Sequence, residues 1–566
     1  MNLRSAASYS FLTLFLVLFG AFFFWPIFIV IRGGFATESG GFTLTYVIEV
    51  FRNPVYREGL LNALGVGLFT TLLSLLISLP LAYVADRYEF FGKKWMGNLI
   101  LLPIMLPPFV GAIGIRQILG QYGILNSVLE SVGILGVGET IDWLGQGRFW
   151  GIVILSALGL YPILYLNLIA SFAQIDPAME EAASNLGANR WRRFWKVTLP
   201  LVGPGMFAGC TIVFIWSFTE LGVPLVFDYD RMISVQIFKG IKELGGNPFP
   251  YAMVGVMLFI SAIAYLSGKL VFGGRGHAMM SKASHAGSSE RLGWKGQSLC
   301  FALFGSVIFL ALMPHLTLVL VSFSADWYDT MLPQHWTLQN YELALGSSLT
   351  VPSIKNSLFY SVLATILNVS LGIGVAFILV RTTVWGRSLL DTCVMLPLAV
   401  PGIVIAFGYL AMTQKGQFFE FLNPIDNPTV LLIIAYAMRK IPFVVRAAVA
   451  GLQQSSVTYE EAAQNLGCPP IKSAFNITHT LITASLIAGA MLAFSQCMLE
   501  VSDSLMLAQK QQFYPITKAI FELLGFLGDG RFIASALGVW AMVFLALTIF
   551  GANRILGKKL GSVFRL

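Results

Sequence analysis

The chain has 566 residues, of which 56% are hydrophobic and only 11% charged, and its formal net charge is +8. Its mean hydropathy of +0.76 excludes a water-soluble globular protein and indicates a membrane protein. The positive charge then indicates membrane topology, since basic residues gather on the cytoplasmic side, and it gives no reason to expect a nucleic-acid partner.

Apolar stretches follow one another along the whole chain. About 20 apolar residues in an α-helix span a bilayer, and we find about twelve such stretches. In chain order they cover residues 11–32, 60–85, 97–116, 149–172, 205–227, 251–272, 298–323, 356–380, 392–413, 428–450, 484–507 and 533–552. The sequence therefore predicts an all-α polytopic membrane protein with about 12 transmembrane helices.

The first stretch is too long for a signal peptide and has no convincing small-residue cleavage site, so we expect it to remain as a helix. An even number of spans places both termini on the same side, and the basic cluster at residues 190–196 and Lys558-Lys559 indicates that this side is the cytoplasm. We expect a multi-pass protein of a bacterial inner membrane. The five cysteines show no disulfide framework and no metal-ligand spacing.

A polar segment divides the chain. Residues 273–297 are rich in Gly, Ser and charge, which predicts a cytoplasmic linker between residues 1–272, the first half, and residues 298–566, the second half. The halves resemble each other at an offset of 294 residues in their first parts, where Asn62, Ala82, Arg87 and Gly92 correspond to Asn356, Ala376, Arg381 and Gly386. Farther on the offset is 280, and Pro162 and Glu220 correspond to Pro442 and Glu500. Since each half has six predicted spans, the two repeats run parallel about an axis along the membrane normal.

A polar motif recurs between the fourth and fifth predicted spans of each half. The sequence EEAASNLGAN starts at Glu180, and EEAAQNLGCP starts at Glu460. Asp176-Pro177 is typical of a helix start, and Gly187 and Gly467 are typical of a helix stop. We therefore predict one short cytoplasmic helix near residues 177–187 and another near 457–467.

Each predicted short helix offers a surface to another protein. Small residues allow a close approach, and the acidic end allows a polar lock. The residues in question are Glu180, Glu181, Ala182, Ala183 and Gly187, and Glu460, Glu461, Ala462, Ala463 and Gly467. The alternative is a plain amphipathic interfacial helix, which two copies at matching positions disfavour.

The motif resembles the EAA loop of type I ABC importer permeases. Glu181-Ala182-Ala183, Gly187 and Leu199-Pro200 fit the pattern, whereas the second copy has His479-Thr480 in place of Leu-Pro. That departure puts an identical docking geometry of the second helix in doubt. The resemblance covers essentially the whole chain and implies a MetI-like transmembrane fold. It also implies short coupling helices that insert into ATP-hydrolysing subunits, alternating access driven by ATP, and a periplasmic or lipid-anchored substrate-binding protein at the outer face.

The sequence contains no recognisable ATP-binding motif. No Gly-x-x-x-x-Gly-Lys-Ser/Thr phosphate loop is present, because Gly268-Lys269 and Gly557-Lys558 lack the preceding Gly and the hydroxyl residue. We therefore expect a transport subunit that is not an enzyme and binds no cofactor, with ATP used by partner subunits. Two coupling helices on one chain predict two such ATP-binding cassette subunits.

Carboxylates inside predicted spans are candidates for a substrate pathway, since buried charge in a membrane is costly. Glu220 and Glu500 occupy matching positions in the two halves, and Asp503 follows Glu500 by nearly one turn. Such oxygen ligands suit hard trivalent iron. Equally, each glutamate could pair with a base or cap a helix break at Gly222-Val223-Pro224.

Basic residues in the tenth predicted span complicate that pathway. Arg439, Lys440 and Arg446 stand where the first half has Gly159, Leu160 and Leu166. They could neutralise Glu500 or Asp503, or attract an anionic substrate. Arg446 could alternatively extend to the inner surface.

The fused arrangement, with Phe-Thr-Glu-Leu-Gly-Val-Pro at residues 218–224, looks most like the ferric iron permease branch. Permeases for phosphonate, thiamine, sulfate or polyamines share the same scaffold, and fold does not fix the cargo.

A secondary transporter with parallel six-helix repeats is a further alternative, but it would need no paired docking helices. A membrane-embedded enzyme would need a polar constellation, and the five histidines are scattered: His277, His285, His315, His335 and His479.

Overall fold

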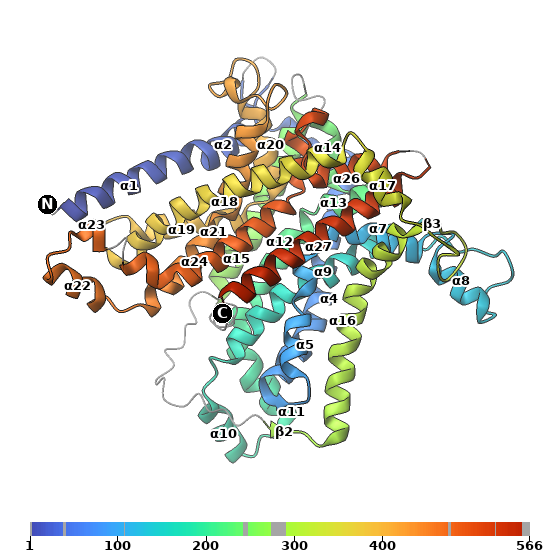
Figure 1. Cartoon of the computed structure of the whole chain (residues 1–566), viewed down its shortest axis with the longest axis horizontal. Helices are drawn as coiled ribbons and strands as arrows, with labels where there is room; N and C mark the ends of the chain where they lie inside the picture. Colours follow the sequence, from blue (N-terminus) through green and yellow to red (C-terminus); the bar gives the residue numbers. More distant parts are fainter. Residues whose placement is uncertain are drawn as a thin grey trace. The chain divides into compact units, whose positions relative to one another are not determined.

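The computed structural model describes residues 3–37, 41–106, 108–145, 147–241, 247–272, 290–473, 477–526 and 528–556, and these are mostly helical (Figure 1). Within these ranges β1 (Tyr88–Glu89) pairs in parallel with β2 (Glu290–Arg291), and β3 (Ser324–Asp326) pairs antiparallel with β4 (His335–Trp336). The predicted all-α membrane fold is confirmed. Most of the predicted linker 273–297, namely residues 273–289, lies outside the described residues. Of its remaining residues, 290–291 form β2 and 294–297 are the start of a long helix.

Nine helical segments of the described ranges are long and apolar enough to cross a membrane. They are Ser8–Gly34, Pro54–Arg87, Arg148–Phe172, Arg190–Val226, Phe249–Ser267, Trp294–Ser322, Thr350–Arg381, His479–Met498 and Gly530–Thr548. Two sharply bent helix pairs raise the number to 11 if each is one span: Lys93–Ile104 with Pro108–Ser131, bent by 93°, and Arg387–Ala399 with Gly402–Met412, bent by 101°.

The predicted count of about 12 spans is therefore not confirmed. The tenth predicted stretch, 428–450, is a helix in the structure, α21 (Thr429–Gln454), but it is not among the apolar segments. Its three basic residues, Arg439, Lys440 and Arg446, explain the difference, because charged side chains are rare in membrane helices unless they are paired.

The chain forms two compact units that differ from the two sequence halves. The first-half unit comprises Arg57–Val235 and Phe259–Asn340, and the second-half unit comprises Met1–Tyr56, Gln236–Leu258 and Tyr341–Leu566. Thus residues 294–322, which open the second half, pack in the first-half unit, and residues 3–34, which open the first half, pack in the second-half unit.

The first-half unit holds most of the elements between residues 54 and 336. They are α4 (Pro54–Arg87), β1, α5 (Lys93–Leu99), α6 (Leu102–Met105), α7 (Pro108–Leu119), α8 (Ile124–Ser131), α9 (Arg148–Phe172), α10 (Pro177–Asn185), α11 (Arg190–Arg193), the π-helix η2 (Phe194–Thr198), α12 (Leu199–Phe218), α13 (Gly222–Val226), β2, α16 (Trp294–Ser322), β3 and β4.

The second-half unit holds the helices at the start and end of the chain. They are α1 (Leu3–Phe19), the π-helix η1 (Gly20–Phe24), α2 (Trp25–Gly34), α3 (Thr45–Arg52), α18 (Thr350–Arg381), α19 (Arg387–Ala399), α20 (Gly402–Met412), the short helix η4 (Glu420–Leu422), α21, α22 (Thr458–Asn465), α23 (Pro470–Ser473), α24 (His479–Met498), α25 (Ser502–Leu507), η6 (Gln511–Phe513), α26 (Ile516–Leu524) and α27 (Gly530–Leu556). Four helices have residues in both units: α4, whose first three residues belong to the second-half unit, α14 (Ile233–Gly240), α15 (Phe249–Phe272) and α17 (Gln339–Gly346).

Glycines at equivalent positions let the exchanged helices pack closely. Gly114 of α7 lies so near Pro314 of α16 that a Cβ there would overlap the proline carbonyl. In the other unit, a Cβ on Gly408 of α20 would lie 2.8 Å from Cβ of Pro26 in α2. Small residues allow such close helix contacts in membrane proteins. In each half, a glycine at the equivalent position therefore lets the first helix of the other half pack closely.

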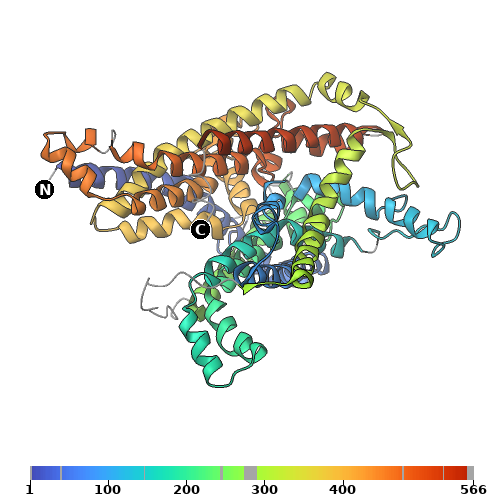
Figure 2. The ribbon, with the colours of Figure 1, turned by 60° about the horizontal axis from the view of Figure 1, so that its bottom comes forward.

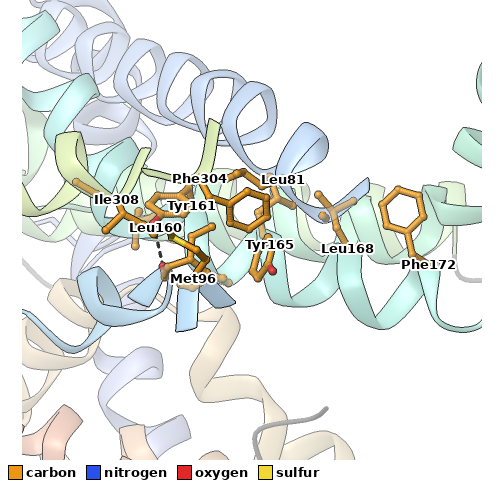
Figure 3. Packing of buried hydrophobic residues seen from close by; sticks show 14 of the residues in the cluster. Leu81, Met96, Leu160, Tyr161, Tyr165, Leu168, Phe172, Phe304 and Ile308 are labelled. Atoms are coloured by element: carbon orange, nitrogen blue, oxygen red, sulfur yellow. Dashed lines mark hydrogen bonds between the residues drawn. The ribbon is translucent and has the colours of Figure 1, made fainter. Parts of the chain in front are cut away.

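The core of the first-half unit lies between α4, α9 and α16 (Figure 3). Leu81, Tyr161 and Phe304, one from each helix, are completely or almost completely buried. The Tyr161 hydroxyl donates a hydrogen bond of 2.8 Å to the carbonyl of Ile100, and Ser78 of α4 donates one of 2.8 Å to the carbonyl of Tyr161. Polar bonds of this kind join helices where lipid provides no hydrophobic driving force. These bonds hold α9 in place, and α10 is the next helix after α9 in the chain.

Candidate functional site

The first copy of the repeated motif folds into α10, at the end of its unit (Figure 1). Asp176 caps the helix by accepting a hydrogen bond of 3.0 Å from the N–H of Ala178, and Pro177 occupies the first turn. The chain leaves the helix at Gly187, where φ is 82°. The N–H of Ala188 then donates to the carbonyl of Ala183 at 3.0 Å, as in a glycine-terminated helix.

The second copy folds into α22 with the same ending. Gly467 has φ of 87°, and the N–H of Cys468 donates to the carbonyl of Ala463 at 3.0 Å. Its start is weaker, because the Ser456 hydroxyl accepts from the N–H of Thr458 at 3.2 Å in place of an aspartate cap. Nothing lies within 4 Å of a Cβ built on either glycine, so the backbone conformation is what requires Gly187 and Gly467. We call α10 and α22 the repeat helices.

The outer faces of the repeat helices match residue for residue. Leu186 and Leu466, beside the terminal glycines, are each 89% exposed, and Met179 and Tyr459 are also exposed at matching positions. Glu181, Glu461, Ala182 and Ala462 are exposed, whereas Ala183 and Ala463 are half-buried. Figure 2 shows α10 and α11 projecting beyond the long helices of their unit. Each repeat helix thus presents a small apolar and acidic surface outward.

Glu180 and Glu460 require a correction, because we had grouped them with the outward-facing residues. Glu180 is 5% and Glu460 4% exposed, and each points back to an arginine at the end of a long helix. Consecutive residues on a helix point about 100° apart, so one glutamate of each pair can point inward while the next points outward. Only Glu181 and Glu461 remain on the outer face.

The buried glutamates take part in ion pairs that the repeat reproduces. Arg87 Nη2 of α4 lies 2.5 Å from Glu180 Oε1, and Arg381 Nε of α18 lies 3.0 Å from Glu460 Oε1. The sequence comparison aligned Arg87 with Arg381, and Glu180 with Glu460, but did not connect the two sets. An arginine and a glutamate that both recur at equivalent positions of the two halves were the sequence signal that could have predicted these ion pairs.

Glu220 caps a helix break. It lies between α12 and α13, half-buried, and its Oε1 accepts hydrogen bonds from the N–H groups of Gly222 at 3.0 Å and Val223 at 3.2 Å. The Ser234 hydroxyl donates to the Glu220 carbonyl at 2.7 Å. This geometry corresponds to a helix cap, because carboxylates are favoured at the free N–H groups of a helix start.

Glu500 also lies at a break, between α24 and α25, but it is surrounded by charge. It forms ion pairs with Arg439 and, through Oε2 at 2.8 Å, with Lys440 Nζ. Asp503, which is fully buried, has its Oδ2 3.2 Å from Arg439 Nη1. Two acids and two bases thus form a neutral buried cluster, which corresponds to the alternative of pairing with a base.

The buried cluster needs space that the first half does not provide. A Cβ on Gly402 would overlap the guanidinium of Arg439. The corresponding positions of the first half carry the opposite sizes, Pro108 and Gly159, and a Cβ on Gly159 would lie 3.3 Å from Cγ of Pro108. In both halves a glycine therefore packs against a larger residue. The glycine is Gly159 in the first half, against Pro108, and Gly402 in the second half, against Arg439.

Arg446 is separate from the buried cluster. Its side chain is 50% exposed, and its Nη2 lies 3.4 Å from Oδ1 of Asp391 in α19. Of the three candidate pathway residues in the second-half unit, Glu500 and Asp503 share the ion pairs of Arg439, and Arg446 has a separate partner. In the described residues, no group of three or more His, Cys, Asp or Glu side chains could hold a metal ion.

Comparison with known proteins gives two matches to one family model. The model is described as a binding-protein-dependent transport system inner membrane component, and it matches residues 75–277 and 368–561. Each match contains one repeat helix and the arginine beneath it.

Curated relatives resemble the chain over most of its length. It is 29% identical to the ferric transport system permease protein FbpB of Actinobacillus pleuropneumoniae, over 89% of this chain and 71% of the relative. It is 28% identical to a putative ferric transport system permease protein, FbpB 1, of Haemophilus influenzae, over 81% of this chain and 70% of the relative. A Fe(3+)-transport system permease protein, FbpB 2, of the same species is 24% identical over 87% and 88%.

Proposed function

This chain belongs to the family of binding-protein-dependent transport system inner membrane components, and we propose that it is the permease subunit of an ABC importer for ferric iron. Two family matches in one chain make it a fused, two-half permease. It is a transport subunit and not an enzyme. The observation that carries the proposal is the pair of repeat helices, which offer the same outward face in both halves.

The repeat helices would act as coupling helices. Each ends in an exposed leucine, Leu186 or Leu466, next to a glycine turn that leaves open space around it. A groove on an ATP-binding cassette subunit would bury that leucine and place its own polar groups near Glu181 or Glu461. Because the two faces match, we propose one ATPase subunit for each helix, with ATP bound and hydrolysed only there.

Transport would proceed by alternating access. With the repeat helices and both termini in the cytoplasm, the opposite ends of the long helices face the periplasm. There a periplasmic or lipid-anchored binding protein would deliver the cargo, in accordance with the family description. Movement of α10 and α22 by the ATPase subunits would then close one side of the pathway and open the other.

Ferric iron is the cargo that the relatives favour, since three of them are described as ferric or Fe(3+) permeases. The two candidate pathway glutamates bear on how iron would be selected. Glu500 is engaged by Arg439 and Lys440, and Glu220 by the backbone of α13, so neither offers a free carboxylate to iron in this conformation. We therefore propose that selectivity depends mainly on the binding protein.

Uptake of radioactive ferric iron into proteoliposomes tests the proposal. The purified complex, with its ATPase subunits and binding protein, should accumulate iron only when ATP is supplied. Phosphonate, thiamine, sulfate and polyamines should not compete at equal concentration. Accumulation of one of these compounds in place of iron would overturn the cargo, and uptake driven by an ion gradient without ATP would overturn the transport class.

A further inference from the structure

One ion pair connects each repeat helix to a membrane helix that is distant in sequence. Arg87 is the last residue of α4, and Arg381 is the last residue of α18. Their partners, Glu180 and Glu460, are 93 and 79 residues further along the chain. We call Arg87–Glu180 and Arg381–Glu460 the tether pairs.

The other main contacts of the repeat helices are local. α10 packs mainly against α11 and η2, and α22 mainly against α23, all of which follow directly in sequence. A force on the exposed face of a repeat helix would therefore reach α4 or α18 directly through the tether pair, and in the first half also by way of η2, whose Phe194 ring contacts Tyr83 of α4.

The tether pairs are protected from water. The glutamate side chains are 6% and 5% exposed, and that of Arg381 is 7% exposed. Arg87 is more accessible at 29%. Because screening by water and salt is weak at buried sites, opposite charges hold each other more firmly there than on the surface.

We infer that the tether pairs transmit motion between the ATPase subunits and the membrane helices, so that Arg87, Glu180, Arg381 and Glu460 are positioning residues for transport. This inference rests on the proposed function. The division of labour follows from helix geometry: Glu181 and Glu461 face the partner, and the neighbouring Glu180 and Glu460 hold the chain's own helices.

The two tether pairs are anchored differently. Glu180 Oε1 also accepts a hydrogen bond of 2.6 Å from the hydroxyl of Thr198, which directly precedes α12. In the second half the corresponding hydroxyl, of Thr478, is buried without a hydrogen-bond partner among the described residues. There Arg381 Nη2 donates instead to the carbonyl of Ser455 at 2.9 Å and to its hydroxyl at 2.8 Å.

This difference assigns a separate connection to each half. Glu180 joins α10 to α4 and to the start of α12, so the glutamate is the shared member. Arg381 joins α18 to α22 and to the end of α21, so the arginine is the shared member. Loss of Glu180 should therefore harm the first half more than loss of Arg87, and loss of Arg381 should harm the second half more than loss of Glu460.

The test measures the ATP hydrolysed per ferric ion transported, in proteoliposomes that hold the complete complex with its ATPase subunits and binding protein. The variants are Glu180→Gln and Glu460→Gln, which keep the size of the side chain and remove its charge. Glu89→Gln is the matched control, because Glu89 forms an exposed ion pair with Lys93 near the same end of α4. Retention of ATPase subunits during purification is measured for every variant.

We expect the ATP cost per ion to rise about fivefold or more in Glu180→Gln and Glu460→Gln, a change within the usual range of coupling between sites. The ATPase subunits should remain bound, and Glu89→Gln should behave as the wild type. The exchange Arg87→Glu with Glu180→Arg should restore most of the coupling that Arg87→Glu alone removes. This pair keeps the test informative even if Arg87→Glu alone does not assemble.

Two results would overturn the inference. One is an unchanged ATP cost per ion in both glutamine variants. The other is an equal fall of transport and ATPase activity with loss of folded protein, and no rescue by the charge exchange, which is what a purely structural role predicts. If the wild-type complex itself shows no ATP-dependent iron uptake, the proposed function fails and not the tether, so the two failures are distinguishable.

Discussion

The two halves of the chain agree next to the repeat helices and differ at the helix breaks inside the fifth predicted span of each half. At α10 and α22, an arginine and a glutamate at equivalent positions form the same ion pair in both halves. At the breaks, Glu220 is bound by two backbone N–H groups, whereas Glu500 is bound by Arg439 and Lys440. An internal repeat is thus preserved where both halves would meet the same kind of partner, and it has diverged where each half only has to stabilise itself.

The divergence involves several positions at once. Arg439, Lys440 and Asp503 stand where the first half has Gly159, Leu160 and Val223. Adding a single base or acid to a buried site would leave an unpaired charge, which is costly. The second half carries two additional bases and one additional acid, which balance only together with Glu500, and it has Gly402, which makes room for the arginine.

The largest expected effect comes from breaking that balance. Arg439→Gly, which introduces the first-half residue, leaves Glu500 with Lys440 alone and Asp503 without its ion-pair partner. Removing one partner from a buried ion pair typically costs about 3–5 kcal/mol. We therefore expect a large drop in the melting temperature of the purified protein, measured by thermal unfolding in detergent.

The triple variant Arg439→Gly, Lys440→Leu and Asp503→Val is the control for this prediction. It converts the whole cluster to its first-half counterpart, and neighbouring substitutions in one network are not additive. It should be more stable than Arg439→Gly alone. A melting temperature of Arg439→Gly equal to that of the wild type would show that the cluster does not stabilise the second half.

A smaller effect separates the two glutamates. Glu500→Gln leaves two buried bases with one acid, and hydrogen bonds to charged groups are worth about 1.5–3 kcal/mol. Glu220→Gln retains an oxygen that can still cap α13, so we expect a loss of about 0.5–1.5 kcal/mol. Thermal unfolding of both variants, with iron uptake by the double variant, checks this ranking.

Equal destabilisation by the two glutamine substitutions would contradict the difference between the breaks. If the double variant transported iron normally despite lower stability, Glu220 and Glu500 would have no part in the cargo pathway. Loss of uptake in a variant that remains folded and keeps its ATPase activity would place them in it.

Substitution at the terminal glycines tests the agreement between the halves. Gly187→Ala and Gly467→Ala force a Cβ into a left-handed conformation, which costs about 1–2 kcal/mol. The two φ values are nearly the same, 82° and 87°, so the local cost should be equal. Both should weaken coupling of ATP hydrolysis to transport, and Gly187→Arg and Gly467→Arg should do so more strongly.

Function distinguishes the two glycines further. Only the first copy of the motif continues to Leu199-Pro200, whereas the second has His479-Thr480. We therefore expect the defect in substrate-stimulated ATPase activity to be greater for Gly187→Arg. Unchanged stimulation in both arginine variants would count against coupling through the repeat helices, and a reversed order would count against this ranking.

The smallest expected effect is that of Arg446→Ala. Its ion pair with Asp391 is half-exposed, and exposed pairs contribute about 0–1 kcal/mol. Thermal unfolding should change little, and iron uptake should remain near the wild-type rate. A strong transport defect in a stable Arg446→Ala protein would return this residue to the cargo pathway, from which its position apart from Glu500 now separates it.

Local features of this fold were predictable from the sequence. Lengths of apolar sequence gave the positions of the long helices, and Asp176-Pro177 and Gly187 gave the start and end of the first repeat helix, because cap and stop residues act within one turn. The alternatives for Glu220 and Glu500 included the cap and the ion pair that the structure contains. In each case the partner was close in sequence or opposite in charge.

Features that depend on distant contacts were not predictable. No periodicity indicates that residues 294–322 pack against α7 and α9, which belong to the other half of the sequence. Nor does it indicate which of Glu180 and Glu181 faces inward, since that depends on where α10 lies relative to Arg87. The partners of Arg439 in α21 were not predictable either, because Glu500 and Asp503 lie 61 and 64 residues further along the chain.

A photocrosslinking experiment tests the central claim most directly. A photoreactive amino acid placed at Leu186, and in a second variant at Leu466, would sit at the exposed tip of each repeat helix. If the two helices are coupling helices, each variant should crosslink to an ATPase subunit in the assembled complex, one subunit for each position. Crosslinking at only one position, or at neither in an assembled and ATP-hydrolysing complex, would contradict the account.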